Sequence, residues 1–177
     1  MRSHAESAAS AVDALTVLVP DFPKPGIVFR DLSPVFADGA ALRLVTDALT
    51  EPWAGRVDAV AGVEARGFVL AAAAAYALGI GTLLVRKAGK LPRAVLTEGY
   101  ALEYGEATLE VHADELPAGS RVLVLDDVLA TGGTLRAATI LIERAGWTVA
   151  GVSVVLELQD LNGRAAVGHP LTAVVTA

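Results

Sequence analysis

Residues 122–135, VLVLDDVLATGGTL, place two adjacent carboxylates and a loop of small residues between two apolar segments. The apolar run before the aspartates predicts a buried strand, and the apolar spacing after the loop predicts a helix. The first N–H groups of a helix have no partner within it, and the helix dipole favours an anion there. We therefore expect a monophosphate to bind the loop through Ala130, Thr131, Gly132, Gly133 and Thr134.

The carboxylates of Asp126 and Asp127 need a different ligand, because they would repel a phosphate. A carboxylate accepts hydrogen bonds, so it suits a donor such as a sugar diol, or a divalent cation. A sugar phosphate would satisfy both halves of the motif. The alternative is an acidic surface turn followed by an ordinary glycine-rich helix start, which rarely combines these parts in this order.

Cations follow two other predicted strands. Arg66 comes just after the apolar run 56–63, where a guanidinium can hold pyrophosphate oxygens, although a surface arginine is the alternative. Arg86, Lys87 and Lys90 lie at the end of the next apolar run. Together they could neutralise a pyrophosphate, but by residue type alone a solvated surface cluster is equally favoured.

The composition limits the class of protein. The chain has 177 residues, 54% of them hydrophobic and 19% charged, so we expect a single domain over residues 1–177 with a substantial core. Its net charge of -6 argues against nucleic acid as a partner, because a sequence-independent binder needs a basic face. The absence of cysteine excludes disulfides and thiolate zinc sites, and it fits a reducing cytosol.

The order of elements predicts the fold. The apolar stretch 68–85 could suggest a membrane span, but Gly79 and Gly81 interrupt it, so we expect a buried helix, a turn and a strand, and no membrane partner. Strands alternating with helices predict an α/β fold, a mainly parallel twisted sheet flanked by helices that binds ligands beyond the carboxyl ends of its strands. Helical patterns span residues 5–18, 38–50 with Asp38 as N-cap, 65–79 and 134–146, and strand patterns span 56–63, 82–87, 121–128 and 147–158.

Two segments lie outside this alternation. Residues 1–37 contain a proline-rich break and an extended segment, 27–36, and we expect most of them to form a small hood. Residues 89–112 predict a mobile loop, 89–99, and then an antiparallel β-hairpin around Gly105.

Several blocks of the chain resemble the adenine phosphoribosyltransferase family, which belongs to the type I phosphoribosyltransferases. DDVLATGGT resembles the family's phosphoribosyl-pyrophosphate (PRPP) motif, and FPKPGIVFRDLSPVF, GVEARGFVL, VRKAGKLP and YALEYGEATLEVH occur in the family's order and spacing. The resemblance covers nearly the whole chain, apart from its start and its C-terminal tail. It implies transfer of ribose 5-phosphate from PRPP to adenine, giving AMP and pyrophosphate in purine salvage, with Mg²⁺ as cofactor, in a cytoplasmic homodimer.

The resemblance also implies roles that spacing alone leaves open. Glu103 would handle the purine proton and Tyr104 would close over the reacting ribose, whereas alternation alone makes Glu103 an outward-facing strand residue. Arg66 would act in catalysis by gripping the pyrophosphate, beside a cis peptide at Glu64–Ala65. Further contacts to PRPP would come from Arg86, Lys87 and, less firmly, Lys90.

The base is expected at Val28, Phe29 and Arg30, with Val128 beside it. Adenine presents a donor amine at C6 and an acceptor at N1, which backbone groups of an extended strand can complement. The resemblance implies that Val28 supplies these backbone contacts and that Phe29 and Arg30 border the ring, to which Phe29 offers a flat apolar face. From spacing alone, Phe29 is equally well a core residue and Arg30 a partner of Asp31.

Two other functions stay open at this point. A xanthine or other purine phosphoribosyltransferase would share the PRPP chemistry and differ at the base. A non-catalytic PRPP-sensing regulator would need a DNA-binding appendage or a basic face, and the sequence indicates neither.

Overall fold

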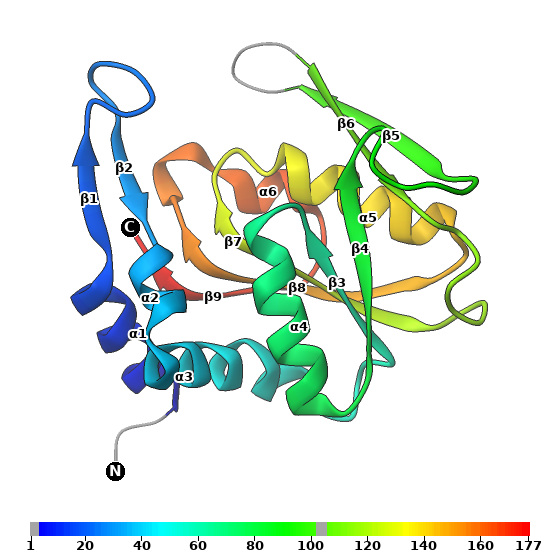
Figure 1. Ribbon diagram of the computed structural model, residues 1–177, viewed down its shortest axis with the longest axis horizontal. Coiled ribbons are helices and arrows are strands. Elements are labelled where there is room, and N and C mark those ends of the chain that lie inside the picture. Colours follow the sequence, from blue (N-terminus) through cyan, green and yellow to red (C-terminus); the bar gives the residue numbers. More distant parts are fainter. Residues whose placement is uncertain (1–3, 102–105) are drawn as a thin grey trace.

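A seven-stranded sheet crosses the molecule, and helices lie on both of its faces (Figure 1). The computed structural model describes residues 4–101 and 106–177. The strand order in the sheet is β5-β6-β4-β3-β7-β8-β9. These strands are β3 (Ala59–Val63), β4 (Gly81–Lys87), β5 (Leu96–Ala101), β6 (Glu106–Val111), β7 (Arg121–Leu129), β8 (Thr148–Glu157) and β9 (Leu171–Thr176).

The helices and a separate two-stranded ribbon make up the rest of the fold. The ribbon pairs β1 (Val17–Pro20) with β2 (Val28–Asp31) in antiparallel fashion and stands at one end of the sheet (Figure 1). The α-helices are α1 (His4–Leu15), α2 (Ser33–Ala37), α3 (Gly39–Thr50), α4 (Arg66–Leu78), α5 (Gly133–Arg144) and α6 (Gly163–Val167), and short 3-10 turns follow as η1 (Glu51–Trp53) and η2 (Gln159–Leu161).

The mainly parallel sheet that the sequence predicts is confirmed. β4, β3, β7, β8 and β9 are paired in parallel, whereas β6 runs antiparallel to both β4 and β5. Because β3 and β7 are parallel neighbours, their carboxyl ends lie at the same edge of the sheet. Arg66 follows β3, and Asp126 and Asp127 lie near the end of β7, so residues far apart in the sequence meet there.

The central strand β7 is buried on both faces. Val122 and Val124 face the core that α5 covers, whereas Leu123 and Leu125 face the core that α3 and α4 cover. All four side chains are fully buried. The alternation follows from the two-residue period of a strand, and burial on both faces is typical of a parallel sheet.

Two local signals set helix boundaries where the sequence predicts them. Asp38 caps α3, because its Oδ1 accepts hydrogen bonds from the N–H groups of Ala40 and Ala41 at 2.9 and 2.8 Å. Gly79 ends α4 with a φ of 69°, a conformation that favours glycine. The stretch 68–85 thus forms a helix, a turn and a strand, and no helix within residues 4–101 and 106–177 is long and apolar enough to cross a membrane.

The predicted N-terminal helix is too long. The helix α1 ends at Leu15, and the residues after it form strand β1 instead. Val17 and Val19 favour a strand once β2 supplies a pairing partner, and helical spacing cannot reveal that partner.

The extended segment expected over 27–36 is also only partly correct. Its first half forms β2, but its second half forms the short helix α2. Asp31 Oδ1 accepts hydrogen bonds from the Ser33 N–H at 2.9 Å and from the Ser33 hydroxyl at 2.6 Å, which holds the start of the helix. Pro34 suits the first turn of a helix, because that turn needs no N–H from it.

The segment expected as a loop, 89–99, is shorter than predicted because β5 begins at Leu96. Leu96 and Tyr100 pack against the core on the α5 side, and pairing with β6 completes the strand. The antiparallel pairing of the predicted hairpin is present, and its first arm is longer than predicted. Its tip, residues 102–105, contains Glu103 and Tyr104 and lies outside the described residues.

Candidate active site

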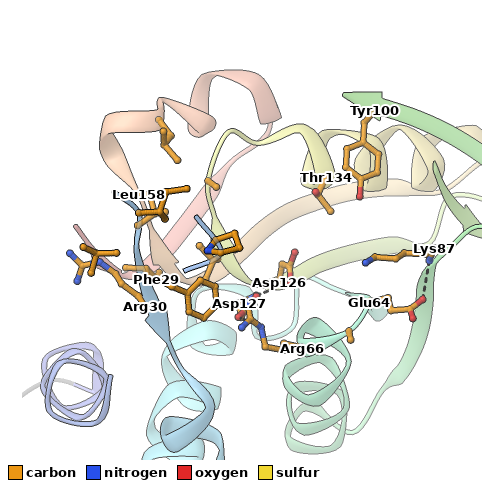
Figure 2. A pocket seen from close by; sticks show the side chains of 18 residues that line it. Phe29, Arg30, Glu64, Arg66, Lys87, Tyr100, Asp126, Asp127, Thr134 and Leu158 are labelled. Carbon is orange, nitrogen blue, oxygen red and sulfur yellow. Dashed lines mark hydrogen bonds and ion pairs between the residues drawn. The ribbon is translucent and has the colours of Figure 1, made fainter. Parts of the chain in front are cut away.

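A cavity of about 570 Å³ opens at the carboxyl edge of the sheet, between the β1–β2 ribbon and the β5–β6 hairpin (Figure 2). It brings together most of the residues that the sequence singles out. Ten of them line it, namely Val28, Phe29, Arg30, Arg66, Lys87, Asp126, Asp127, Val128, Ala130 and Thr134.

The two aspartates project from β7 in opposite directions, as neighbours on a strand do. Asp126 is partly exposed, whereas Asp127 is only 5% exposed. The N–H of Asp127 donates a hydrogen bond of 2.9 Å to Asp126 Oδ1. Gly67 makes room for this arrangement, because a Cβ there would lie 2.8 Å from the Leu125 carbonyl oxygen and 3.2 Å from Asp126 Oδ1.

Burial changes the acidity of both carboxyls. It raises the pKa of Asp126 well above its ordinary value, and the charge of Asp127 raises that pKa further. Burial also raises the pKa of Asp127, although the nearby Arg66 acts in the opposite direction. Two perturbed carboxyls side by side in a cavity indicate a functional site, because such shifts are common where a ligand binds.

Arg66 begins α4 and turns its side chain toward Asp127 (Figure 2). Its Nε lies 2.6 Å from Asp127 Oδ2. The Nε–H does not point at this oxygen, so Asp127 Oδ2 accepts no hydrogen bond from the described residues. The guanidinium carbon also lies 5.6 Å from the centre of the Phe29 ring, a cation–π distance. Arg66 is therefore at the centre of the site, but it is paired with a carboxylate.

The loop from Ala130 to Thr134, which the sequence predicts as an anion cradle, joins β7 to α5. It surrounds a hollow of about 70 Å³, and α5 begins within it at Gly133. Gly132 has a φ of 85°, and a Cβ there would lie 2.4 Å from the Gly163 carbonyl oxygen. A Cβ on Gly163 would in turn lie 2.1 Å from the Ala130 carbonyl oxygen. The loop thus rests directly on the start of α6, and only glycines fit at this contact.

Glu64 binds the cationic segment, residues 86–90, at the other side of the cavity. Its Oε2 accepts a hydrogen bond from the Lys87 N–H at 3.0 Å and lies 3.4 Å from Arg86 Nε. The Lys87 N–H, and then Arg86, hold the pKa of Glu64 below its ordinary value despite partial burial. The Glu64–Ala65 peptide is cis, as expected. Lys87 lines the cavity, whereas Arg86 and Lys90 do not.

The ribbon supplies the apolar wall. Phe29 packs edge-to-face on Phe22, with ring centres 5.2 Å apart, and faces the aspartates (Figure 2). Arg30, the next residue on the strand, extends away from Phe29 and from the aspartates. Asp31 accepts hydrogen bonds from Ser33, and Arg30 borders the cavity without serving as the partner of Asp31 that spacing left open.

Some lining residues were not predicted. Tyr100 points its hydroxyl into the cavity from β5, opposite Phe29 (Figure 2). Leu158 and Leu161 approach from the chain that follows β8. Alternation around Tyr100 could have suggested an inward-facing residue, but no local pattern relates the two leucines to the aspartates. Glu103 and Tyr104 lie outside the described residues.

Comparison with known proteins gives a consistent result. The model of the phosphoribosyl transferase domain family matches residues 39–169. The adenine phosphoribosyltransferase of Renibacterium salmoninarum is 67% identical over 171 residues, which cover 96% of this chain and 94% of that protein.

Solved structures of adenine phosphoribosyltransferases have a similar fold. The adenine phosphoribosyltransferase of Rhodothermus marinus superposes with a TM-score of 0.90 at 43% identity, covering 97% of this chain and 99% of that one. The enzyme of Saccharomyces cerevisiae, in complex with adenine and an imino-altritol bisphosphate, gives a TM-score of 0.91 at 35% identity and covers 96% and 99%.

Proposed function

The chain belongs to the adenine phosphoribosyltransferases of the phosphoribosyl transferase family, and from this premise we propose how its site performs the reaction. It is a pentosyltransferase of purine salvage that converts adenine and PRPP into AMP and pyrophosphate. In this reaction, adenine N9 forms a bond to the anomeric carbon of the ribose. The bond from that carbon to the pyrophosphate oxygen breaks with its electron pair, and N9 loses its proton.

The two halves of the PRPP motif divide the sugar phosphate between them. The loop Ala130–Thr134 holds the 5-phosphate through backbone N–H groups and hydroxyls, while Asp126 and Asp127 accept hydrogen bonds from the ribose diol. The observation that carries this proposal is the cavity of about 570 Å³, which is lined by the two carboxylates, by the ribbon and by both ends of the cradle, Ala130 and Thr134. Such a site binds a polar sugar phosphate beside an apolar base.

The pyrophosphate group extends toward the cations. Positive charge develops on the ribose and negative charge on the leaving pyrophosphate, so Arg66 and Lys87 lower the barrier by stabilising the leaving group. Arg86 and Lys90 add to the same field from just outside the cavity. By family resemblance, Glu103 receives the N9 proton and Tyr104 covers the ribose, and residues 89–95 and the hairpin exclude water.

The base lies between the ribbon and the chain after β8. The strand β2 pairs with β1 on one side only, so the backbone groups of its other edge have no strand partner within the described chain. At Val28 this edge can accept from the C6 amine of adenine and donate to N1, a pattern that 6-oxopurines do not match. Phe29 stacks on the ring, and Val128 borders it with Leu158 and Leu161.

Magnesium fits this site as a companion of PRPP. The described residues contain no group of three or more metal-ligating side chains, and Mg²⁺ commonly uses one or two carboxylates together with substrate phosphates. Asp126 and Asp127 are the pair that would hold it. When bound, the ion supplies positive charge that neutralises the pyrophosphate as it leaves.

The active form is proposed to be a cytoplasmic homodimer. Large apolar side chains are exposed on α4 and β4, at Val69 (46%), Tyr76 (92%) and Leu84 (41%), and a partner subunit would cover them. The absence of cysteine suits a reducing compartment. Light scattering on the wild type and on Tyr76→Glu tests the dimer, and a monomeric wild type would contradict it.

An assay of PRPP-dependent pyrophosphate release tests the function. Adenine, hypoxanthine, guanine, xanthine and orotate are compared at equal concentration, and adenine should be preferred by orders of magnitude. Comparable efficiency with xanthine would favour the other purine transferase. PRPP binding without turnover of any base would favour the PRPP-sensing regulator.

A further inference from the structure

Glu110 is a buried carboxylate that the mechanism above does not use. It lies on β6 opposite Arg86 of β4, and it is only 3% exposed. Its neighbours Leu109 and Val111 face the core on the α5 side, so Glu110 faces the opposite side of the strand. A buried charge is costly unless it is compensated, so its partners show what it does.

Those partners are three successive backbone N–H groups. Gly89 donates to Glu110 Oε2 at 2.9 Å, while Lys90 and Leu91 donate to Oε1 at 2.7 and 2.6 Å. Gly89 has a φ of 80°, which turns the chain so that consecutive N–H groups converge on one anion. Burial by itself would raise the pKa of Glu110, but the three N–H groups outweigh it and hold the pKa below its ordinary value.

The strand β6 and the residue after it make two further contacts with the neighbouring residues 88–94. The N–H of Ala88 donates to the Thr108 carbonyl at 2.9 Å, and His112 Nδ1 lies 3.2 Å from the Ala94 carbonyl oxygen. Thr108, Glu110 and His112 are two residues apart in β6 and the residue after it, so their side chains point to the same side. Residues 88–94 are therefore fastened along that side, with Glu110 at the centre.

The attachment leaves the ammonium groups of Lys87 and Lys90 without an ion pair among the described residues. Glu110 bonds to the backbone of the segment, and no ion pair joins Lys87 or Lys90 to a carboxylate within residues 4–101 and 106–177. Arg86 bridges the two ends of the segment, because its Nε meets Glu64 and its Nη1 donates to the Lys90 carbonyl at 3.4 Å. Glu64 fixes one end of the cationic segment and Glu110 fixes the other.

We propose that Glu110 is a positioning residue for PRPP, which holds the backbone of Gly89–Leu91 so that Lys87 faces the pyrophosphate group inside the cavity and Lys90 adds its charge from just outside. This inference rests on the proposed function, in which these cations meet the leaving group. A carboxylate that hydrogen-bonds only to backbone can set the direction of a cationic segment while the lysine side chains stay outside ion pairs.

Glu110→Gln tests the proposal, because it keeps the volume but replaces one acceptor oxygen with an NH₂ group that opposes an N–H donor. We expect the KM for PRPP to rise roughly tenfold, with kcat and the KM for adenine changed less than about twofold. Amide exchange at Gly89–Leu91 in the ligand-free protein should become faster. Asp58→Asn is the matched control, since it also removes a carboxylate that bonds to a backbone N–H, far from the cavity.

Each outcome decides the matter. Faster amide exchange with an unchanged KM for PRPP would make Glu110 merely structural, and unchanged exchange would refute the attachment itself. If Glu110→Gln fails to fold, Gly89→Ala distorts the same turn in open space and should raise the KM for PRPP alone. Should Lys87→Ala leave PRPP kinetics unchanged, the proposed role of the cations fails independently of Glu110.

Discussion

Arg66 Nε and Asp127 Oδ2 lie 2.6 Å apart across the mouth of the candidate active site. The cation expected to meet the pyrophosphate and a carboxylate expected to meet the ribose thus neutralise one another in this structure. Because Asp127 Oδ2 accepts no hydrogen bond from the described residues, a sugar hydroxyl can replace this contact favourably. In the proposed binding mode, we therefore expect PRPP to separate the pair when it binds.

Asp127→Asn should separate the two roles. The ribose loses an acceptor, so kcat/KM for PRPP should fall roughly 10- to 100-fold. Pyrophosphate has no ribose and meets an unpaired Arg66, so as an inhibitor it should bind at least as tightly as it binds the wild type. Steady-state kinetics and pyrophosphate inhibition measure both effects. A parallel loss of pyrophosphate affinity would contradict the assignment.

Asp126→Asn should stabilise the ligand-free protein while weakening PRPP use. The folded-state pKa of Asp126 is raised, so its contribution to stability is fully present below the ordinary value of 3.8 and is lost as the pH rises through the folded-state pKa. At neutral pH, the neutral amide should therefore raise the free energy of unfolding by about 1 kcal/mol. Urea denaturation at pH 5 and pH 8 checks this, and the gain should grow with pH. A variant less stable than the wild type at pH 8 would count against it.

The Asp58–Arg121 pair should make stability depend on acidic pH. Hydrogen bonds from Arg121 lower the pKa of Asp58 to about 2 from 3.8. The pair therefore contributes stability above the ordinary pKa and loses it as the pH falls toward the lowered one. Asp58→Asn should lower the thermal midpoint at pH 6, and the difference from the wild type should shrink toward pH 2. Arg121→Gln should behave alike, and a difference independent of pH would refute the linkage.

Gly163→Ala should damage the phosphate cradle without altering any group that contacts substrate. Its Cβ would lie 2.1 Å from the Ala130 carbonyl oxygen and 2.9 Å from the Gly132 nitrogen, so the loop has to move. A displacement of this kind should reduce kcat/KM for PRPP about 10²-fold. Gly81→Ala is the control, because a Cβ there meets nothing within 4 Å. Equal kinetics in the two variants would show that α6 does not determine the position of the Ala130–Thr134 loop.

The sequence by itself determined the features that a few neighbouring residues decide. The acidic pair followed by Ala130–Thr134 predicts its own strand, turn and helix, because apolar periodicity and the needs of a helix start act within one turn. Asp38 starts α3 and Gly79 ends α4 for equally local reasons. The alternation of strands and helices then predicts a parallel sheet whose carboxyl edge carries both Arg66 and the aspartates.

Only the tertiary structure decided which distant groups meet. The pairing of Arg66 with Asp127, the inward hydroxyl of Tyr100 and the backbone contacts of Glu110 join segments that are far apart in the chain. A strand pattern indicates that Glu110 faces away from the core, but not that a loop buries it. Such contacts depend on strand order and on where loops pack, and no local periodicity encodes either of these. The sequence therefore determined which functional groups lie at the sheet edge, and the packing of distant segments decided how those groups are oriented and paired.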